Sequence, residues 1–214
     1  MKNKIIASLL CAAAVLGLAG CSSQPEETTS AATEQTTTSS ETTKATTEET
    51  AANAGFDTTD FLSSYPSFEV TSEDLAGGVW ADEISYTEAG QNASPALSWA
   101  PVEGATVYVI YMVDTSGQYW LHWKSDAVTE TELPRGWAPE SDYIGPYPPS
   151  GDTHVYEIYV VALRAPVERL KGAFNSLNPN FEAFLEGLDT DAEGNTGNIV
   201  AYGHISGEFT SIAF

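Results

Sequence analysis

The stretch YIGPYPPSGDTHVYEIYVVAL, residues 143–163, decides the fold predicted for this chain. Its first part is a loop rich in glycine and proline (Gly145, Pro146, Pro148, Pro149, Gly151). Proline fixes φ and glycine permits positive φ, so such a loop can hold one shape with little packing. An apolar strand follows, with His154 and Tyr156 on one of its faces. The loop either holds a side chain over a pocket or is a structural turn before a core strand.

The residues before this stretch predict further strands. Thr106 to Val113 (TVYVIYMV) is an almost continuous run of β-branched and aromatic residues, typical of a strand buried on both faces. Other short stretches also predict strands (67–73, 81–86, 97–99 and 119–128). Thr129 to Asp142 is polar and contains two prolines, so we expect a loop there. Three tryptophans in this part are expected in the core (Trp99, Trp120, Trp123).

The residues after the stretch contain one convincing helix. Asn180 to Leu188 carries apolar residues at spacings of three and four, with Asn178 as the expected cap. Pro166 to Leu170 predicts a helical turn, and residues 199–202 and 205–214 predict two closing strands. Many strands with few helices and no βα alternation predict a mostly β protein, an antiparallel β-sandwich with one or two short helices.

The N-terminal residues 1–20 have the pattern of a lipoprotein signal peptide. Lys2 and Lys4 precede an apolar run from Ile5 to Ala19, which ends in Leu-Ala-Gly before Cys21. We expect cleavage before Cys21 and attachment of acyl chains, such as palmitate, to that residue. The alternative is an uncleaved membrane anchor. The predicted location is a bacterial cell membrane, with the protein lipid-anchored on the extracytoplasmic face.

Residues 21–54 continue from the lipidated Cys21 as a stretch of Thr, Ser, Glu and Ala with almost no large apolar side chain. Such a composition cannot bury enough surface to offset the entropy of ordering, so it predicts a disordered tether. A tether of this length spans roughly 30 Å as a coil and about 110 Å when extended.

The remaining residues, 55–214, are expected to form one domain of ordinary size. They contain five basic and 24 acidic residues, a formal net charge near −19. This charge argues against nucleic acid as a partner and against a basic contact with anionic lipid. Cys21 is the only cysteine after the signal peptide, which excludes internal disulfides, cysteine-ligated metals and a catalytic thiol in the mature chain.

Metal and nucleophile motifs are weak. DTDAEGNTG, residues 189–197, loosely resembles a calcium loop, but its twelfth position is Val200 rather than Glu, and a strand follows. The sequence contains no HExxH pair and no GxSxG elbow. No metal or other cofactor is therefore expected.

Two histidines and a carboxylate form the best candidate cluster. His122 and His154 each lie beside a turn and aromatic residues, and Asp114 ends the apolar strand. A histidine beside a carboxylate can bind an oxyanion as an imidazolium or act as an acid or base. The alternatives are structural: His154 and Tyr156 hydrogen-bond the neighbouring loop, and Asp114 caps a turn.

The order of several motifs resembles the phosphatidylethanolamine-binding protein family. These motifs are NASPALSW at 92–99, Asp114 after an apolar strand, His122-Trp123, and GPYPPSGDTHVYEIYVVAL at 145–163. The chain is most similar to the bacterial branch of the family, the Raf kinase inhibitor-like proteins. The resemblance covers about Ser67 to Phe209.

The resemblance implies a β-sandwich with a small pocket for phosphate-type head groups or small anions. It assigns the ligand-binding residues by position (Asp114, His122, Pro148, Pro149, His154, Tyr156). The chain departs from the family pattern in two places. Thr115 and Ser116 replace the Pro and second Asp of an Asp-Pro-Asp loop, and Val155 replaces the Arg between the last His and Tyr.

The function that follows is a membrane-anchored extracytoplasmic binding domain for a small anionic or phosphorylated ligand, without catalysis. One alternative is a protein-interaction module, such as a protease inhibitor, and an open or covered pocket would discriminate the two. The residues 129–142 are the segment expected to cover it. A less favoured alternative is a small-ester hydrolase, with Ser116 or Ser150 near the pocket but in no nucleophile motif.

Overall fold

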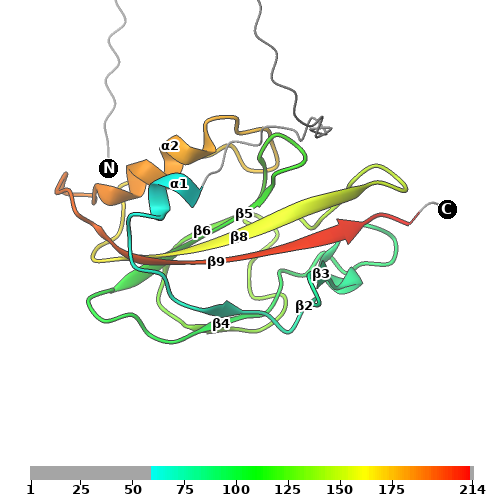
Figure 1. Ribbon diagram of the computed structural model, residues 1–214, viewed down its shortest axis with the longest axis horizontal. Coiled ribbons are helices and arrows are strands. Elements are labelled where there is room, and N and C mark those ends of the chain that lie inside the picture. Colours follow the sequence, from blue (N-terminus) through cyan, green and yellow to red (C-terminus); the bar gives the residue numbers. More distant parts are fainter. Residues whose placement is uncertain (1–58, 213–214) are drawn as a thin grey trace, which may run out of the picture. The chain divides into compact units, whose positions relative to one another are not determined.

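The computed structural model describes residues 59–212 (Figure 1). The predicted signal peptide, Cys21 and the predicted tether lie outside the described residues. No helix within 59–212 has the length and apolar content needed to cross a membrane.

A six-stranded sheet forms the centre of the described domain (Figure 1). Its strands, in spatial order, are β2 (Leu75–Ala76), β3 (Val79–Trp80), β9 (Ile199–Thr210), β8 (Thr153–Leu163), β5 (Val107–Asp114) and β6 (Trp120–Val128). All neighbouring strands are antiparallel except β3 and β9, which are parallel. The long strands β5, β6, β8 and β9 supply most of the sheet, and the predicted stretch 143–163 ends in β8.

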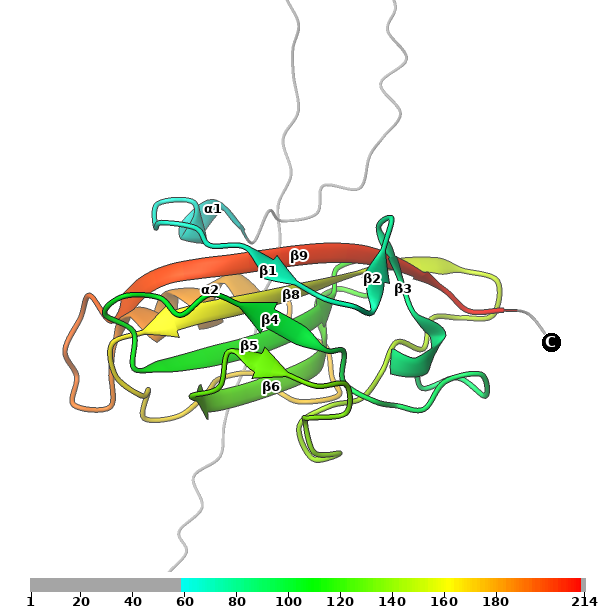
Figure 2. The ribbon, with the colours of Figure 1, turned by 90° about the horizontal axis from the view of Figure 1, so that it is seen from below.

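A second, three-stranded antiparallel sheet covers one face of this central sheet, as the turned view in Figure 2 shows. It consists of β1 (Val70–Thr71), β4 (Leu97–Trp99) and β7 (Glu132–Leu133). Helices α1 (Thr59–Leu62) and α2 (Phe181–Glu186) lie on the opposite face, and the 3₁₀ helix η2 (Gly187–Asp189) follows α2. A further 3₁₀ helix, η1, spans Asp82–Ile84.

Strand β5 shows why the central sheet is apolar on both faces. Tyr108 and Ile110 belong to the core between the two sheets, whereas Val109 and Tyr111 belong to the core under the helices. Successive side chains of a strand point to opposite faces, so a strand between two layers needs apolar residues at every position. The predicted burial of this strand on both faces and the mostly β, largely antiparallel fold class are confirmed.

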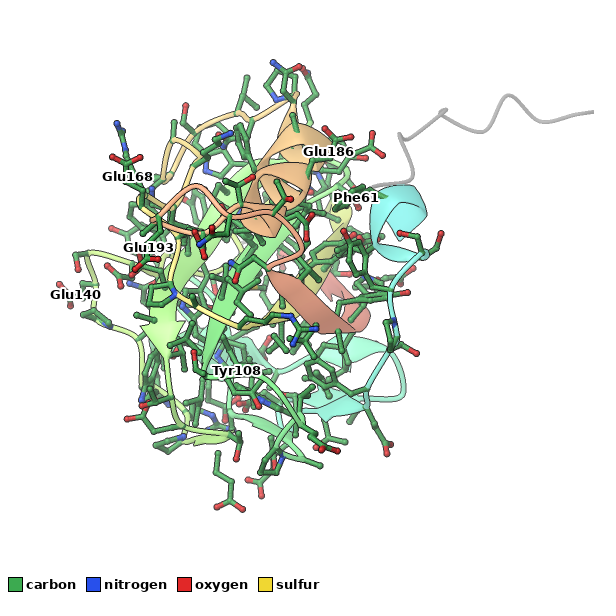
Figure 3. The ribbon with its side chains drawn as sticks, turned by 90° about the vertical axis from the view of Figure 1, so that its left-hand side faces the viewer. Phe61, Tyr108, Glu140, Glu168, Glu186 and Glu193 are labelled. Atoms are coloured by element: carbon green, nitrogen blue, oxygen red, sulfur yellow. The ribbon has the colours of Figure 1, made fainter. Side chains whose placement is uncertain are left out.

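Most of the acidic residues lie on the outside of the domain. Figure 3 labels Glu140, Glu168, Glu186 and Glu193 around the periphery of the ribbon, and all four side chains are exposed. Their solvation explains how a domain with so large an excess of carboxylates still folds around an apolar core.

Several predicted elements were wrong in detail. Residues 81–86 are not a strand: they contain η1, in which the Ser85 amide donates to the Asp82 carbonyl oxygen at 2.9 Å. The expected loop 129–142 contains β7, because Leu133 is buried and pairs with Leu97 of β4. Each of these elements is two or three residues long and is determined by tertiary pairing, which local sequence does not encode.

The C-terminal part also differs from expectation. Residues 166–170 form no helix. Asn178 does not cap α2; its side chain bonds the Ala173 amide and the Ser176 carbonyl oxygen within the preceding loop. The two predicted closing strands are one continuous strand, β9, in which Gly203 pairs with Val160 of β8.

Candidate functional site

The predicted site residues meet at one end of the central sheet. Asp114 is the last residue of β5, and it pairs with Tyr156 of β8 on one side and Trp120 of β6 on the other. Directly paired residues point to the same face, and so does His154, two residues before Tyr156. These three strands therefore place a carboxylate, an imidazole and a phenol together.

A β-bulge brings His122 to the same place. Met112 pairs with Trp123 and Val113 with Leu121, so His122 is the extra residue of β6. Leu121 and Trp123 consequently pack in cores on opposite faces of the sheet, although they are only two residues apart. Bulges redirect side chains in this way, often beside functional sites.

These side chains line a pocket of about 370 Å³, which we call the histidine pocket. Its lining is Tyr86, Asp114, Gly117, Trp120, His122, Ile144, Gly145, Tyr147, His154, Tyr156 and Asn175. No residue of the segment 129–142 lines it, so within the described chain that segment does not cover the pocket. A larger hollow of about 720 Å³, beside α2, contains Arg169 and Lys171 but none of the predicted site residues.

Asp114 and His154 form a hydrogen-bonded pair in the lining of the histidine pocket. His154 Nδ1 lies 2.6 Å from Asp114 Oδ2, and the Gly117 amide donates to Asp114 Oδ1 at 2.8 Å. Because a carboxylate only accepts, His154 donates from Nδ1, which leaves Nε2 as the ring nitrogen able to meet a ligand. A Cβ on Gly117 would lie 2.7 Å from Asp114 Oδ2, so glycine allows the carboxylate this position.

His122 is the buried histidine of the pair. Its Nδ1 donates to the Ile144 carbonyl oxygen at 2.8 Å, and the Ile144 amide donates back to the His122 carbonyl oxygen at 2.8 Å. Burial lowers the pKa of His122, and the nearby carbonyls and Asp114 only partly oppose this. The ring is therefore neutral at neutral pH, with Nδ1 protonated.

Tyr156 lies between the two histidines. Its ring is edge-on to His122, with centroids 5.1 Å apart, and nearly parallel to His154 at 6.5 Å. Burial raises the pKa of its phenol, and the charge of Asp114 raises it further. A hydrogen bond from the hydroxyl to the Asp114 carboxylate raises the pKa as well, so the hydroxyl keeps its proton and donates within this cluster.

The glycine and proline loop is held by its neighbours as well as by its own residues. The Gly145 amide donates to Asn92 Oδ1 at 2.8 Å, and the Tyr86 amide donates to the Pro146 carbonyl oxygen at 2.9 Å. A Cβ on Gly145 would lie 2.1 Å from the Ile84 carbonyl oxygen, so the loop backbone packs directly against η1. The loop is thus both a packed turn and one wall of the histidine pocket.

Pro148 and Pro149 do not line the histidine pocket. They line a neighbouring hollow of about 350 Å³, together with Thr87, Glu88, Tyr147, Ser150, Ser211 and Ile212. Tyr147 lines both, and 65% of this residue is exposed. The structure brings together Asp114, His122, His154 and Tyr156, and it places the two prolines one hollow away.

Sequence reasoning missed much of the aromatic lining. Trp120 was expected in the core but lies half-buried at the pocket, where its Nε1 donates to Asn175 Oδ1 at 3.1 Å. Trp99 and Trp123 are core residues, as predicted. Tyr86 comes from a segment far away in sequence and carries no local signal. Tyr147 stands within the Gly/Pro-rich loop, and this position between Pro146 and Pro148 is the sequence signal that could have identified it.

The two residues that replace the family's loop pattern tie the loop to β8. The Ser116 hydroxyl oxygen accepts from the Val155 amide at 3.0 Å, and the Thr115 amide donates to the Val155 carbonyl oxygen at 3.0 Å. Within the described chain, Ser116 and Ser150 make no hydrogen bond to His122 or His154. This arrangement gives neither serine an adjacent base.

The described residues offer no metal site. Among residues 59–212, no three His, Cys, Asp or Glu side chains lie close enough to hold an ion. In the calcium-like segment, Asp191 instead accepts from the amides of Glu193 and Asn195 and from the Asn195 side chain. These hydrogen bonds lower the pKa of Asp191 and close a polar turn.

Comparison with known proteins bears on both the fold and the family. Residues 71–208 match the family model described as phosphatidylethanolamine-binding protein. No curated protein matches the chain by sequence. The crystal structure of Escherichia coli YbcL, described as a new member of the mammalian PEBP family, aligns with a TM-score of 0.51 and 23% identity, over 67% of this chain and 98% of YbcL. A putative phosphatidylethanolamine-binding protein homologue from Chlamydia trachomatis, CT736, aligns with a TM-score of 0.48 and 22% identity, over 66% of this chain and 96% of CT736.

Proposed function

Because this chain belongs to the phosphatidylethanolamine-binding protein family, we propose that its histidine pocket binds a small anionic or phosphorylated ligand without catalysis. We also propose that it is a lipoprotein of the bacterial Raf kinase inhibitor-like branch, anchored through Cys21. The domain then acts on the extracytoplasmic face of a bacterial membrane, at the end of the tether 21–54.

The observation that carries the binding proposal is the position of Tyr156 between His122 and His154. The Tyr156 hydroxyl keeps its proton, and His154 has only Nε2 left for a ligand. When His154 is protonated, Asp114 compensates its charge and Nε2 becomes a second donor. Donors held in a mostly apolar pocket suit an oxyanion, because little ordering is needed on binding.

The anchoring proposal is supported by the sequence pattern at Cys21 and by the acidic domain. A surface with few basic groups gains little from anionic lipid, so attachment through acyl chains is the physically simpler route to a membrane. Labelling with radioactive palmitate, compared between the wild type and Cys21→Ser, tests this. Equal labelling of both would overturn the anchor and leave the pocket proposal unaffected.

The alternative, a protein-interaction module such as a protease inhibitor, is favoured by one observation. Tyr86 and Tyr147 are 54% and 65% exposed at the pocket rim, and exposed aromatic residues often form protein contacts. The open pocket, which residues 129–142 do not cover, favours the small ligand. A small-ester hydrolase is less favoured, since neither Ser116 nor Ser150 has a histidine beside it.

Calorimetric titration of the full chain in detergent with inorganic phosphate and acetate tests the binding proposal. We expect binding, accompanied by proton uptake that shows as a heat difference between two buffers of unlike ionisation enthalpy. In parallel, the ring nitrogen resonances of His122 and His154 should shift together. Absence of both heat and resonance shifts would refute the anion pocket and direct the search to protein partners.

A further inference from the structure

The histidine pocket and the neighbouring hollow are lined by residues of the same two segments, 86–88 and 144–150. Tyr86 lines the first, and Thr87 and Glu88 line the second. On the other side, Tyr147 lines both and the residues 148–150 continue into the second. The hydrogen bond from the Tyr86 amide to the Pro146 carbonyl oxygen holds the two segments beside each other. We call these two neighbouring hollows, which share Tyr147, the Tyr147 trough.

The Tyr147 trough is too large for a bare anion. Each of its hollows alone, about 370 and 350 Å³, falls within the range of roughly 300–1,000 Å³ typical of small-molecule sites. A phosphate or acetate in contact with His122 and His154 would leave most of the trough unfilled. A ligand that fits the trough has an anionic end group and a longer body.

Exposed aromatic rings and short polar groups characterise the walls. Tyr86 and Tyr147 form an edge-to-face pair with centroids 6.0 Å apart, and Trp120 presents a third partly exposed ring. The second hollow adds hydroxyls and one carboxylate (Thr87, Ser150, Ser211, Glu88), and neither hollow is lined by Lys or Arg. Flat rings pack against the C–H faces of pyranoses, and hydroxyls and carboxylates bond their hydroxyls.

We propose that the ligand of the Tyr147 trough is an acidic saccharide, such as a sugar phosphate or an acid-bearing oligosaccharide. This inference rests on the proposed anion binding. The acidic group lies at His122, His154 and Tyr156, and the sugar rings pass over Tyr147 toward Pro149. The second hollow is lined by Pro148, Pro149 and Ile212 as well as by hydroxyls and Glu88, so an acyl chain would cover these polar groups without giving them hydrogen-bond partners.

The test is a calorimetric comparison on the full chain in detergent. The ligands are inorganic phosphate, phosphoethanolamine, glucose 6-phosphate and maltose 1-phosphate. We expect maltose 1-phosphate to bind at least about tenfold more tightly than inorganic phosphate, a difference of about 1.4 kcal/mol, with glucose 6-phosphate between them. Phosphoethanolamine serves as the charged head group of a lipid without a sugar.

Variants at Ser150 and Tyr147 locate the sugar, and a variant at Val79 is the control. Ser150→Leu fills the second hollow and is expected to abolish the advantage of maltose 1-phosphate over phosphate, whereas Ser150→Ala should keep most of it. Tyr147→Phe should retain the advantage better than Tyr147→Ala, because the ring rather than the hydroxyl carries the stacking. Val79→Ala, at an exposed apolar residue outside the trough, is the matched control and should change nothing.

The outcomes separate the two proposals. If phosphate binds and the sugar phosphates bind no more tightly, or if phosphoethanolamine equals maltose 1-phosphate, the saccharide inference fails and anion binding stands. The saccharide inference also fails, again without affecting anion binding, if Ser150→Leu keeps the full advantage. If none of the four compounds binds, both proposals fail.

Discussion

Two buried carboxylates of this domain look alike in sequence and differ in their partners. Asp74 has a fully buried side chain, which forms an ion pair with Arg135 and accepts from the Ala96 amide at 2.7 Å. Asp114 has an 8% exposed side chain, which accepts hydrogen bonds from His154 Nδ1 and from the Gly117 amide. Each carboxylate therefore has one basic side-chain partner and one backbone donor.

The difference lies in whether the partner can lose its charge. Arg135 is always protonated, and its hydrogen bond to Asp74 raises its pKa further, so this pair is permanent. It joins the β1–β2 segment to the loop after β7 and does not line the histidine pocket. Histidine, unlike arginine, has both a neutral and a protonated form, and His154 does line that pocket. The lesson is that a permanent pair holds the fold, whereas an adjustable pair in a pocket can respond to a ligand.

Removal of the permanent carboxylate should have the largest effect on stability. Asp74→Ala leaves the Ala96 amide without its acceptor and Arg135 without its partner, so we expect a loss of about 3 kcal/mol in the free energy of unfolding. Urea unfolding measures it. The neighbouring exposed Glu73→Ala should change it by less than about 0.5 kcal/mol. If Asp74→Ala lowered the free energy of unfolding no more than Glu73→Ala does, the Asp74–Arg135 pair would not have the structural role given to it.

Removal of His154, the partner of Asp114, should affect ligand binding more than the stability of the fold. His154→Ala deletes a charge-assisted donor, so we expect a 10- to 100-fold rise in the Kd for phosphate, about 1.4–2.8 kcal/mol. The free energy of unfolding should change by less than in Asp74→Ala, because His154 is partly exposed. Titration calorimetry and urea unfolding on the same sample give both values. A variant that binds as well as the wild type would show that the pair is structural.

The buried histidine should make stability depend on pH. Burial lowers the pKa of His122 in the folded state, so below about pH 6.5 the unfolded chain takes up a proton that the folded chain does not. Neutral His122 therefore makes its full contribution to the free energy of unfolding above pH 6.5. This contribution is lost as the pH falls toward the pKa of His122 in the folded state, by at most about 1.4 kcal/mol per pH unit. His122→Asn, which can still donate to the Ile144 carbonyl, should flatten the curve between pH 7 and 5. If the free energy of unfolding of the variant and of the wild type changed with pH in parallel, His122 would not be the cause of the pH dependence.

The smallest expected effect comes from Gly117. Its Cβ in Gly117→Ala would meet Asp114 Oδ2 at 2.7 Å, so the carboxylate must shift away from His154. We expect a few-fold rise in the Kd for phosphate, with about 1 kcal/mol or less of destabilisation. Gly151→Ala is a useful contrast, because its φ of +86° strains the backbone while nothing lies within 4 Å of its Cβ. It should destabilise without changing affinity, and the opposite pattern would contradict the role given to Asp114.

Much of this site could be predicted from sequence because its functional side chains lie at the ends of strands. Asp114, His154 and Tyr156 follow or begin long apolar strands, and antiparallel pairing brings such ends together. His122 was identified by its neighbouring Trp123, but the bulge that turns it into the pocket has no sequence signature. A lone histidine on a regular strand would have pointed to either face.

The errors have a common physical origin. Pro148 and Pro149 were placed in the pocket by their position in a motif, but each residue along a turn points in a new direction, and only Tyr147 reaches both hollows. Asn175 has a positive φ of 52° in the loop before α2, and only tertiary contacts bring it to Trp120. Long apolar runs determine the strands, whereas the pocket rim depends on short segments distant in sequence.

The outer edge of β6 has a consequence for solubility. Ordinarily such an edge exposes unpaired backbone groups, which can recruit a strand from another molecule. Here Trp120 and Trp123 form bridges to Leu177 and Tyr143, and the backbones of residues 175 and 144 bond β6 directly. The loops that supply Asn175 and Ile144 to the pocket thus also shield the sheet. Resistance to aggregation at this edge would therefore come from the same backbone bonds that position the loops of the ligand site.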